Sequence, residues 1–229
     1  ETTAIAHVDH YKSFHPGTVG QPLPGLEVKI ADDGEVLFRG PSIMDRYHKD
    51  PERTAEALDE DGWFHTGDVG TLDDDGYLTI RDRKKDLFKT SGGKYIAPQK
   101  IEGTIAANIP YVSQAVVIGE GRKYVTALVE LDHDMLMRWG QRHGHPDASY
   151  AELSQRPEIF SSIERHMAKA NEQLERWETV KKFAILDAPL ADEEGVTTAS
   201  MKVRRHQVSE RYADLINGLY PSEDNVTDD

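Results

Sequence analysis

The chain has 229 residues, with 27 lysines and arginines against 41 aspartates and glutamates, and its formal net charge is −14. Residues 1–84 carry 9 basic and 18 acidic groups, and residues 85–229 carry 18 and 23, so both halves are acidic and a general nucleic-acid binder is excluded. The absence of cysteine excludes disulfides, thiolate metal sites and cysteine nucleophiles. No apolar run approaches the roughly 20 residues of a membrane-spanning helix.

The first third of the chain has the pattern of small antiparallel β structure with one short helix. Short strands are predicted at 26–30 and 35–38, and again at 69–72 and 77–80. Each pair is separated by an aspartate-glycine turn signal, which favours hairpins. Asp50 followed by a proline predicts a helix that begins there and ends near residue 58.

The character of the sequence changes at Arg81. The basic run 81–85 has no apolar anchor, which is typical of a linker or a solvated turn. Beyond it, helices and strands mix, so we predict an α+β fold with an acidic, disordered tail at 221–229. The expected helices are 98–108, 133–143, 156–177 and 206–216, and the expected strands are 112–118, 124–131 and 180–186.

Several motifs are weak when each is considered alone. The segment Ser91–Lys94 is not a phosphate loop, because Phe88 stands where the first glycine is needed and Tyr95 follows the lysine. A flexible glycine turn is the favoured interpretation there. The ten histidines show no metal-binding spacing, and they are interpreted as surface residues. A basic helix start around Lys202 opposes the helix dipole, which indicates a phosphate or carboxylate nearby.

Taken together and in order, four segments carry a resemblance to a known family. The chain resembles the C-terminal part of the AMP-forming acyl-CoA synthetases, within the adenylate-forming superfamily. The segment Asp82–Glu102 is most similar to the long-chain fatty-acid–CoA ligases. The other three matching segments are Gly34–Tyr47, Gly62–Asp68 and Gly195–Arg205.

This resemblance implies a division into two domains. Residues 1–84 would be the β-rich end of the large adenylation domain. Residues 85–229 would be the small mobile domain, with a helical insertion at about 132–179. The triphosphate loop, the adenine pocket and most of the acyl tunnel would belong to the upstream N-terminal domain of the same protein. We therefore expect the chain to be a fragment that is inactive alone.

The resemblance also assigns residues for adenylation. Asp68 and Arg83 would hold the ribose of ATP and AMP, and Glu1 would bind the Mg²⁺ of MgATP. Lys202 would be the catalytic lysine that bridges the attacking carboxylate and the α-phosphate. It follows a Ser-Met pair, whereas the commoner form of the motif has glycine directly before the lysine.

A second set of residues is implied for domain rotation and thioester formation. Lys85 would be the hinge about which the small domain turns. In the second pose the loop that contains Lys89, Gly92 and Gly93 would face the site and leave room for the pantetheine arm of coenzyme A.

Three hypotheses remain open at this stage. The first is a long-chain fatty-acid–CoA ligase in the cytoplasm, with fatty acid, ATP and coenzyme A as substrates and no transmembrane segment; peripheral membrane contact stays open. The second is an adenylating enzyme that loads a carrier protein. The third is a non-catalytic interaction module, although Asp68, Arg83 and Lys202 are all in place.

Overall fold

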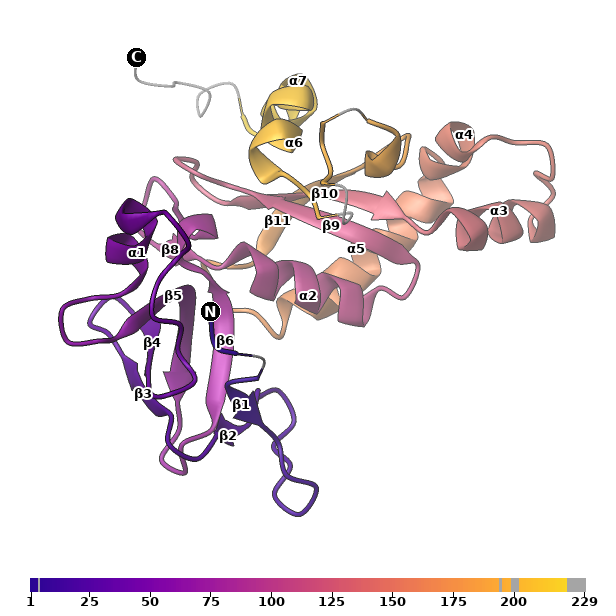
Figure 1. The fold of residues 1–229 in the computed structure, drawn as a ribbon. Coiled ribbons are helices and arrows are strands. Elements are labelled where there is room, and N and C mark those ends of the chain that lie inside the picture. Colours follow the sequence, from indigo (N-terminus) through magenta and orange to yellow (C-terminus); the bar gives the residue numbers. More distant parts are fainter. Residues whose placement is uncertain (4, 194, 199–201, 222–229) are drawn as a thin grey trace. The chain divides into compact units, whose positions relative to one another are not determined.

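The computed structural model describes residues 1–3, 5–193, 195–198 and 202–221 (Figure 1). The chain divides into two compact units, Glu1–Leu87 and Phe88–Asp229. Each unit has a hydrophobic core of its own. The mixed α+β class expected from the sequence is confirmed. The tail predicted to be disordered falls, from residue 222 onward, outside the described residues.

The first unit is built on a four-stranded antiparallel sheet whose strands follow one another in chain order. A two-stranded ribbon and the helix α1 (Pro51–Ala57) accompany it. Asp50 caps α1 by accepting a hydrogen bond from the backbone nitrogen of Arg53 at 3.0 Å. The strands of the sheet are β3 (Glu27–Ile30), β4 (Glu35–Arg39), β5 (Phe64–Leu72) and β6 (Leu78–Arg83), and those of the ribbon are β1 (His7–Val8) and β2 (Gln21–Pro22).

The prediction of a linker or solvated turn at 81–85 is wrong for residues 81–83. Strand β6 continues to Arg83, and the short 3-10 helix η1 (Lys84–Asp86) follows it. The ladder to β5 pairs Val69 with Asp82 and Asp68 with Arg83. Backbone pairing with a neighbouring strand needs no apolar side chains, which is why a polar run can extend a strand.

The second unit is a three-stranded sheet with helices on both faces. Strand β9 (Val112–Ile118) pairs antiparallel with the central β10 (Val125–Leu131), and β11 (Val180–Ile185) pairs parallel with β10. In Figure 1, α2 (Pro98–Asn108) and α5 (Pro157–Asn171) lie on one face, and α6 (Arg205–Arg211) and α7 (Ala213–Gly218) on the other. The remaining elements are β7 (Phe88–Lys89), β8 (Tyr95–Ile96), α3 (His133–Arg142), α4 (Tyr150–Ser154) and the 3-10 helix η2 (Leu190–Asp192).

Two predicted helices differ from the expectation. Helix α5 ends at Asn171 and not at 177, because the Asn171 amide bonds both backbone groups of Val180, at 2.8 and 2.9 Å, and so joins the end of the helix to β11. The closing helix is interrupted at Tyr212. Helix α4 was not predicted, although Ser149 and Glu152 form the capping box that marks its start. None of the helices in the described part of the chain is long and apolar enough to cross a membrane.

Candidate functional site

The segment Thr66–Asp68 forms a bulge within β5. Leu37 of β4 pairs with His65 and Glu35 pairs with Val69, so β5 carries extra residues between these two pairs. Gly67 has φ of +70°, a left-handed conformation that glycine adopts without steric cost. The Thr66 hydroxyl donates to the Val36 carbonyl at 2.7 Å and accepts from the backbone nitrogen of Asp68 at 3.0 Å. Bulges of this kind re-aim side chains, and here the side chain concerned is Asp68.

Asp68 and Arg83 form an ion pair across strands β5 and β6. They are direct neighbours in the ladder, and the Arg83 Nε lies 2.8 Å from the Asp68 Oδ1. Burial raises the pKa of Asp68, and the Arg83 charge opposes that shift. Arg83 also lines a small hollow together with Gly67, Lys84 and Lys85. A carboxylate beside a guanidinium presents both acceptors and donors, which suits a vicinal diol.

A buried glutamate, Glu35, which the sequence analysis missed, stabilises the bulge by a hydrogen bond to its backbone. Glu35 is 4% exposed and accepts hydrogen bonds from the backbone nitrogen of Gly67 at 2.9 Å, from Lys84 at 2.9 Å and from His65 at 3.1 Å. Lys84 also pairs with Asp33 at 2.7 Å. A charged residue at the start of an apolar strand was the signal that could have revealed Glu35.

This network predicts a specific loss of stability in acid. Burial raises the pKa of Glu35, but the hydrogen bonds from Lys84, His65 and Gly67 outweigh burial and hold it below its ordinary value of 4.5. The folded state therefore binds fewer protons than the unfolded state, and the contribution of Glu35 is present above pH 4.5 and lost as the pH falls below it. We expect Glu35→Gln to flatten the acid limb of the unfolding free energy, measured by urea titration between pH 6 and 3. An unchanged slope would contradict the assignment.

Glu1 is held beside Tyr47 at the start of the first unit. The Tyr47 hydroxyl donates to the Glu1 Oε1 at 2.8 Å, and the backbone nitrogen of Met44 donates to the Glu1 carbonyl at 2.8 Å. Within the described ranges, no group of three or more acidic or histidine side chains could hold a metal ion. A single carboxylate is compatible with a Mg²⁺ ion that arrives with ATP, since that ion keeps phosphate and water ligands.

The predicted coenzyme A loop is the hairpin between β7 and β8 in the second unit. Lys89 pairs with Tyr95 in the ladder, and its Nζ lies 4.5 Å from the centre of the Tyr95 ring. The turn closes through a 3.0 Å hydrogen bond from the backbone nitrogen of Thr90 to the Lys94 carbonyl. Gly93 has φ of +75°. A Cβ at Gly93 would have no atom within 4 Å, and one at Gly92 would approach only the Thr90 hydroxyl, at 3.9 Å, so the turn is uncrowded.

The two glycines of this turn should respond differently to alanine. Gly93→Ala places a Cβ on a residue whose backbone is left-handed, and it should lower the free energy of unfolding by about 1 kcal/mol. Gly92 lies outside that conformation and its surroundings are open, so Gly92→Ala should change stability by less than about 0.5 kcal/mol. Urea titration of both variants checks this difference. Equal losses would mean that crowding, rather than backbone conformation, selects glycine here.

Lys202 lies at the end of the loop that follows Thr198. Thr197 pairs with Val203, the backbone nitrogen of Thr198 donates to the Lys202 carbonyl at 2.8 Å, and the backbone nitrogen of Lys202 donates to the Thr198 hydroxyl at 3.0 Å. The lysine is exposed. The Ser-Met pair that precedes it lies outside the described residues. The backbone of the lysine is thus held while its ammonium remains accessible to solvent.

Arg205 anchors that loop to the body of the second unit. It is the first residue of α6, and its guanidinium binds both carboxylate oxygens of Glu102 and, at 3.0 Å, the Val117 carbonyl. Glu102 in turn accepts from the backbone nitrogen of Val117 at 2.8 Å. The anion expected beside the basic helix start is therefore, for Arg205, a carboxylate of the chain itself. Sequence reasoning missed this pairing because it joins segments about a hundred residues apart.

The predicted residues fall into separate groups. Asp68, Arg83 and Lys85 lie around the bulge in β5. Glu1 belongs to the same unit of the chain but not to the bulge. Lys89, Gly92 and Gly93 share one hairpin of the second unit, and Lys202 belongs to another loop of that unit. Each group is locally ordered by the hydrogen bonds described above.

Comparison with known proteins identifies the class to which this fold belongs. Residues 85–224 match the family model described as AMP-binding enzyme C-terminal domain, and the chain belongs to this family. It is similar to a Mycobacterium tuberculosis protein that carries the name fatty-acid–CoA ligase fadD11, with 44% identity over 97% of this chain and 39% of that protein. It is also similar to the long-chain-fatty-acid–CoA ligase FadD15 of the same organism, with 38% identity over 97% of this chain and 37% of that protein.

A solved structure agrees with these relatives. The adenylation domain of carboxylic acid reductase from Segniliparus rugosus, in complex with AMP and a co-purified carboxylic acid, superimposes with a TM-score of 0.65. Its sequence is 26% identical, and the match covers 88% of this chain and 32% of that one. The chain spans less than two fifths of the length of the curated relatives to which it is compared here.

Proposed function

We propose that the chain is the C-terminal part of an AMP-forming long-chain fatty-acid–CoA ligase. The observation that carries the proposal is the Asp68–Arg83 pair, which stands beside a glycine bulge at the position where the resemblance places the nucleotide ribose. The similarity of nearly the whole chain to long-chain ligases supports the choice of substrate class.

The proposed reaction has two halves. In the first, an oxygen of the fatty carboxylate attacks the α-phosphorus of MgATP, and pyrophosphate leaves to give acyl-AMP. In the second, the thiol of coenzyme A attacks the acyl carbonyl, its proton passes to solvent, and AMP leaves. Negative charge gathers on phosphate or carbonyl oxygens in both halves, so each needs oriented donors or cations.

The residues of the first unit would bind the nucleotide. The Asp68 carboxylate would accept hydrogen bonds from the ribose hydroxyls, and the rigid donor fork of Arg83 would add a second contact. Glu1 would supply one oxygen ligand to the Mg²⁺ that accompanies ATP. The left-handed Gly67 keeps Asp68 at this position on the strand.

The residues of the second unit would act in turn. Lys202 would place its ammonium between the attacking carboxylate and the α-phosphate, because a flexible point charge suits a group that must arrive and then leave. After rotation about Lys85, the hairpin with Lys89, Gly92 and Gly93 would face the thioester reaction. Exchange of two loops lets one site perform two reactions with different geometric needs.

The test is a product analysis on the full-length protein. With palmitate, MgATP and coenzyme A we expect palmitoyl-CoA, AMP and pyrophosphate in equal amounts, measured by chromatography. Formation of ADP and phosphate would overturn the proposal. If coenzyme A is not acylated while a phosphopantetheine-bearing carrier protein is, the carrier-loading alternative holds in its place.

A further inference from the structure

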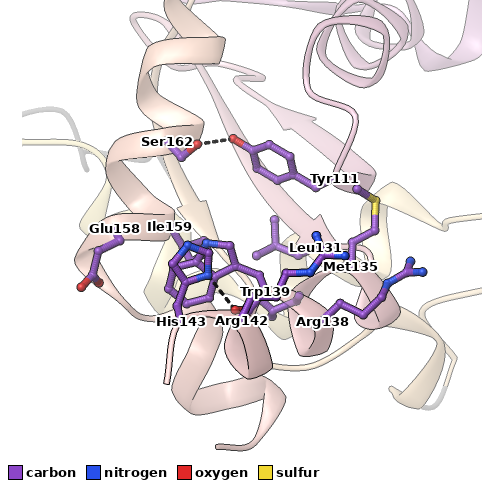
Figure 2. A pocket seen from close by; sticks show the side chains of 11 residues that line it. Tyr111, Leu131, Met135, Arg138, Trp139, Arg142, His143, Glu158, Ile159 and Ser162 are labelled. Atoms are coloured by element: carbon purple, nitrogen blue, oxygen red, sulfur yellow. Dashed lines mark hydrogen bonds between the residues drawn. The ribbon is translucent and has the colours of Figure 1, made fainter. Parts of the chain in front are cut away.

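The second unit contains a cavity that takes no part in the proposed chemistry. Its volume is about 490 Å³, within the range typical of small-molecule sites. Figure 2 shows its lining side chains, which come mainly from helices α3 and α5. Helix α4 packs against both of these helices. None of the residues proposed for adenylation or thioester formation lines this cavity.

The walls of the cavity are mainly apolar. Leu131, Leu136 and Ile159 are buried core residues that form part of the lining. Trp139 and Met135 of α3 are further apolar residues of the lining, and Met135 is 39% exposed. An unbranched, flexible methionine at such a position adapts to the shape of an apolar guest. The walls are therefore suited to an aliphatic chain.

Several polar groups of the lining are already satisfied within the protein. The Tyr111 hydroxyl lies 2.6 Å from the Ser162 Oγ and 3.1 Å from the His166 Nδ1. The His143 ring stacks on Trp139, with 4.4 Å between ring centres, and its Nδ1 lies 2.8 Å from the Trp139 carbonyl. These groups are not left without partners when the cavity holds an apolar chain.

Two positively charged side chains of the cavity lie on helix α3. Arg138 and Arg142 lie one turn apart on α3, line the cavity, and are exposed. The Arg138 Nε donates to the Asp134 carbonyl at 3.1 Å, and neither guanidinium forms an ion pair with a carboxylate among the residues that the structure describes. The acidic lining residue Glu158 has its own cation in Arg156, at 3.4 Å. In a chain of net charge −14, these two arginines are available to bind an anion.

We propose that this cavity binds a single-chain amphiphile with an anionic head, and specifically a fatty carboxylate. The aliphatic chain lies between α3 and α5, and the carboxylate is bound by Arg138 and Arg142. A concave site with a helix on either side takes up one chain, whereas a membrane surface would need a convex or flat apolar face. The site goes beyond the proposed function, because it lies outside the groups assigned to catalysis.

The test is calorimetric titration of the 229-residue chain with sodium dodecanoate below its micelle concentration. We expect saturable binding at one site per chain. Dodecanol, which lacks the charge, should bind about tenfold more weakly. Hexanoate has six methylenes fewer, and each buried methylene changes affinity by about fourfold, so hexanoate should bind more than about 10³-fold more weakly.

Two matched double variants test the charged groups. Arg138→Ala with Arg142→Ala should weaken dodecanoate binding by about tenfold, while Arg165→Ala with Arg176→Ala, which removes two exposed arginines outside the cavity, should change it by less than about twofold. Met135→Trp should also weaken binding, by narrowing the cavity. Circular dichroism and the melting temperature check that every variant is folded.

Three results would overturn the proposal. Absence of saturable dodecanoate binding would exclude the site, and equal weakening in both double variants would reduce it to non-specific charge attraction. Binding to phosphatidylglycerol vesicles that depends on Arg138 and Arg142, without binding of free dodecanoate, would identify a membrane-contact surface. Because the readout is binding to the chain itself, failure here leaves the product analysis of the proposed ligase unaffected.

Discussion

Lys202→Ala in the full-length protein is expected to lower the rate of acyl-AMP formation by about 10²–10³-fold, by analogy with the loss of one donor that stabilises developing charge. The same variant should convert supplied acyl-AMP and coenzyme A to thioester at a near-normal rate, because the proposed domain rotation would carry the lysine away before the second half-reaction. Release of pyrophosphate measures the first half, and acyl-CoA formation from synthetic acyl-AMP measures the second.

The folded state of this variant should be unchanged. Lys202 is exposed, and its loop is held by backbone bonds to Thr198 and by the Arg205–Glu102 pair, all of which alanine preserves. Lys169→Ala is a matched control, since it removes an exposed lysine from the end of α5. Normal adenylation by Lys202→Ala would end the assignment. Equal loss of both halves would indicate a role in general AMP binding or in folding.

Lys85→Pro is expected to lower thioester formation by roughly tenfold or more and to leave adenylation largely intact. Lys85 lies within the 3-10 helix η1, whose usual φ is close to the value of about −65° that proline imposes. The substitution therefore holds this residue near its present backbone conformation, and it would oppose the proposed rotation, which only the second half-reaction would require. The two half-reactions are measured separately, as for Lys202.

Lys85→Ala is the matched control, because it removes the same charge and leaves the backbone free to rotate. We expect it to retain most of the thioester activity that is lost in Lys85→Pro. Proline also restricts the preceding residue, Lys84, whose ammonium binds Asp33 and Glu35. Urea titration must therefore show unchanged stability in Lys85→Pro. If proline and alanine have the same effect, or if both half-reactions fall equally, Lys85 is not the pivot.

Much of the fold could be predicted from the sequence, because local signals and tertiary packing agree there. The aspartate-glycine turns around Gly34 and Gly76 predicted two hairpins, and both are present in the first unit. The alternation around Val28 and the apolar run of β9 likewise predicted strands that pair with their neighbours. Asp68 and Arg83 could be named because each stands in a segment whose order along the chain resembles that of a family.

What the sequence could not determine depends on contacts between distant segments. The strand predicted at 69–72 begins at Phe64 in the structure. Pairing with β4 makes Thr66–Asp68 a bulge inside this strand, with buried Glu35 bound to the Gly67 backbone. The pairing of Arg205 with Glu102 and the end of α5 at Asn171 arise in the same way. Periodicity and propensity report the preferences of neighbouring residues, whereas a buried charge or a side chain that ends a helix is stabilised by partners that only the folded chain brings within hydrogen-bond distance.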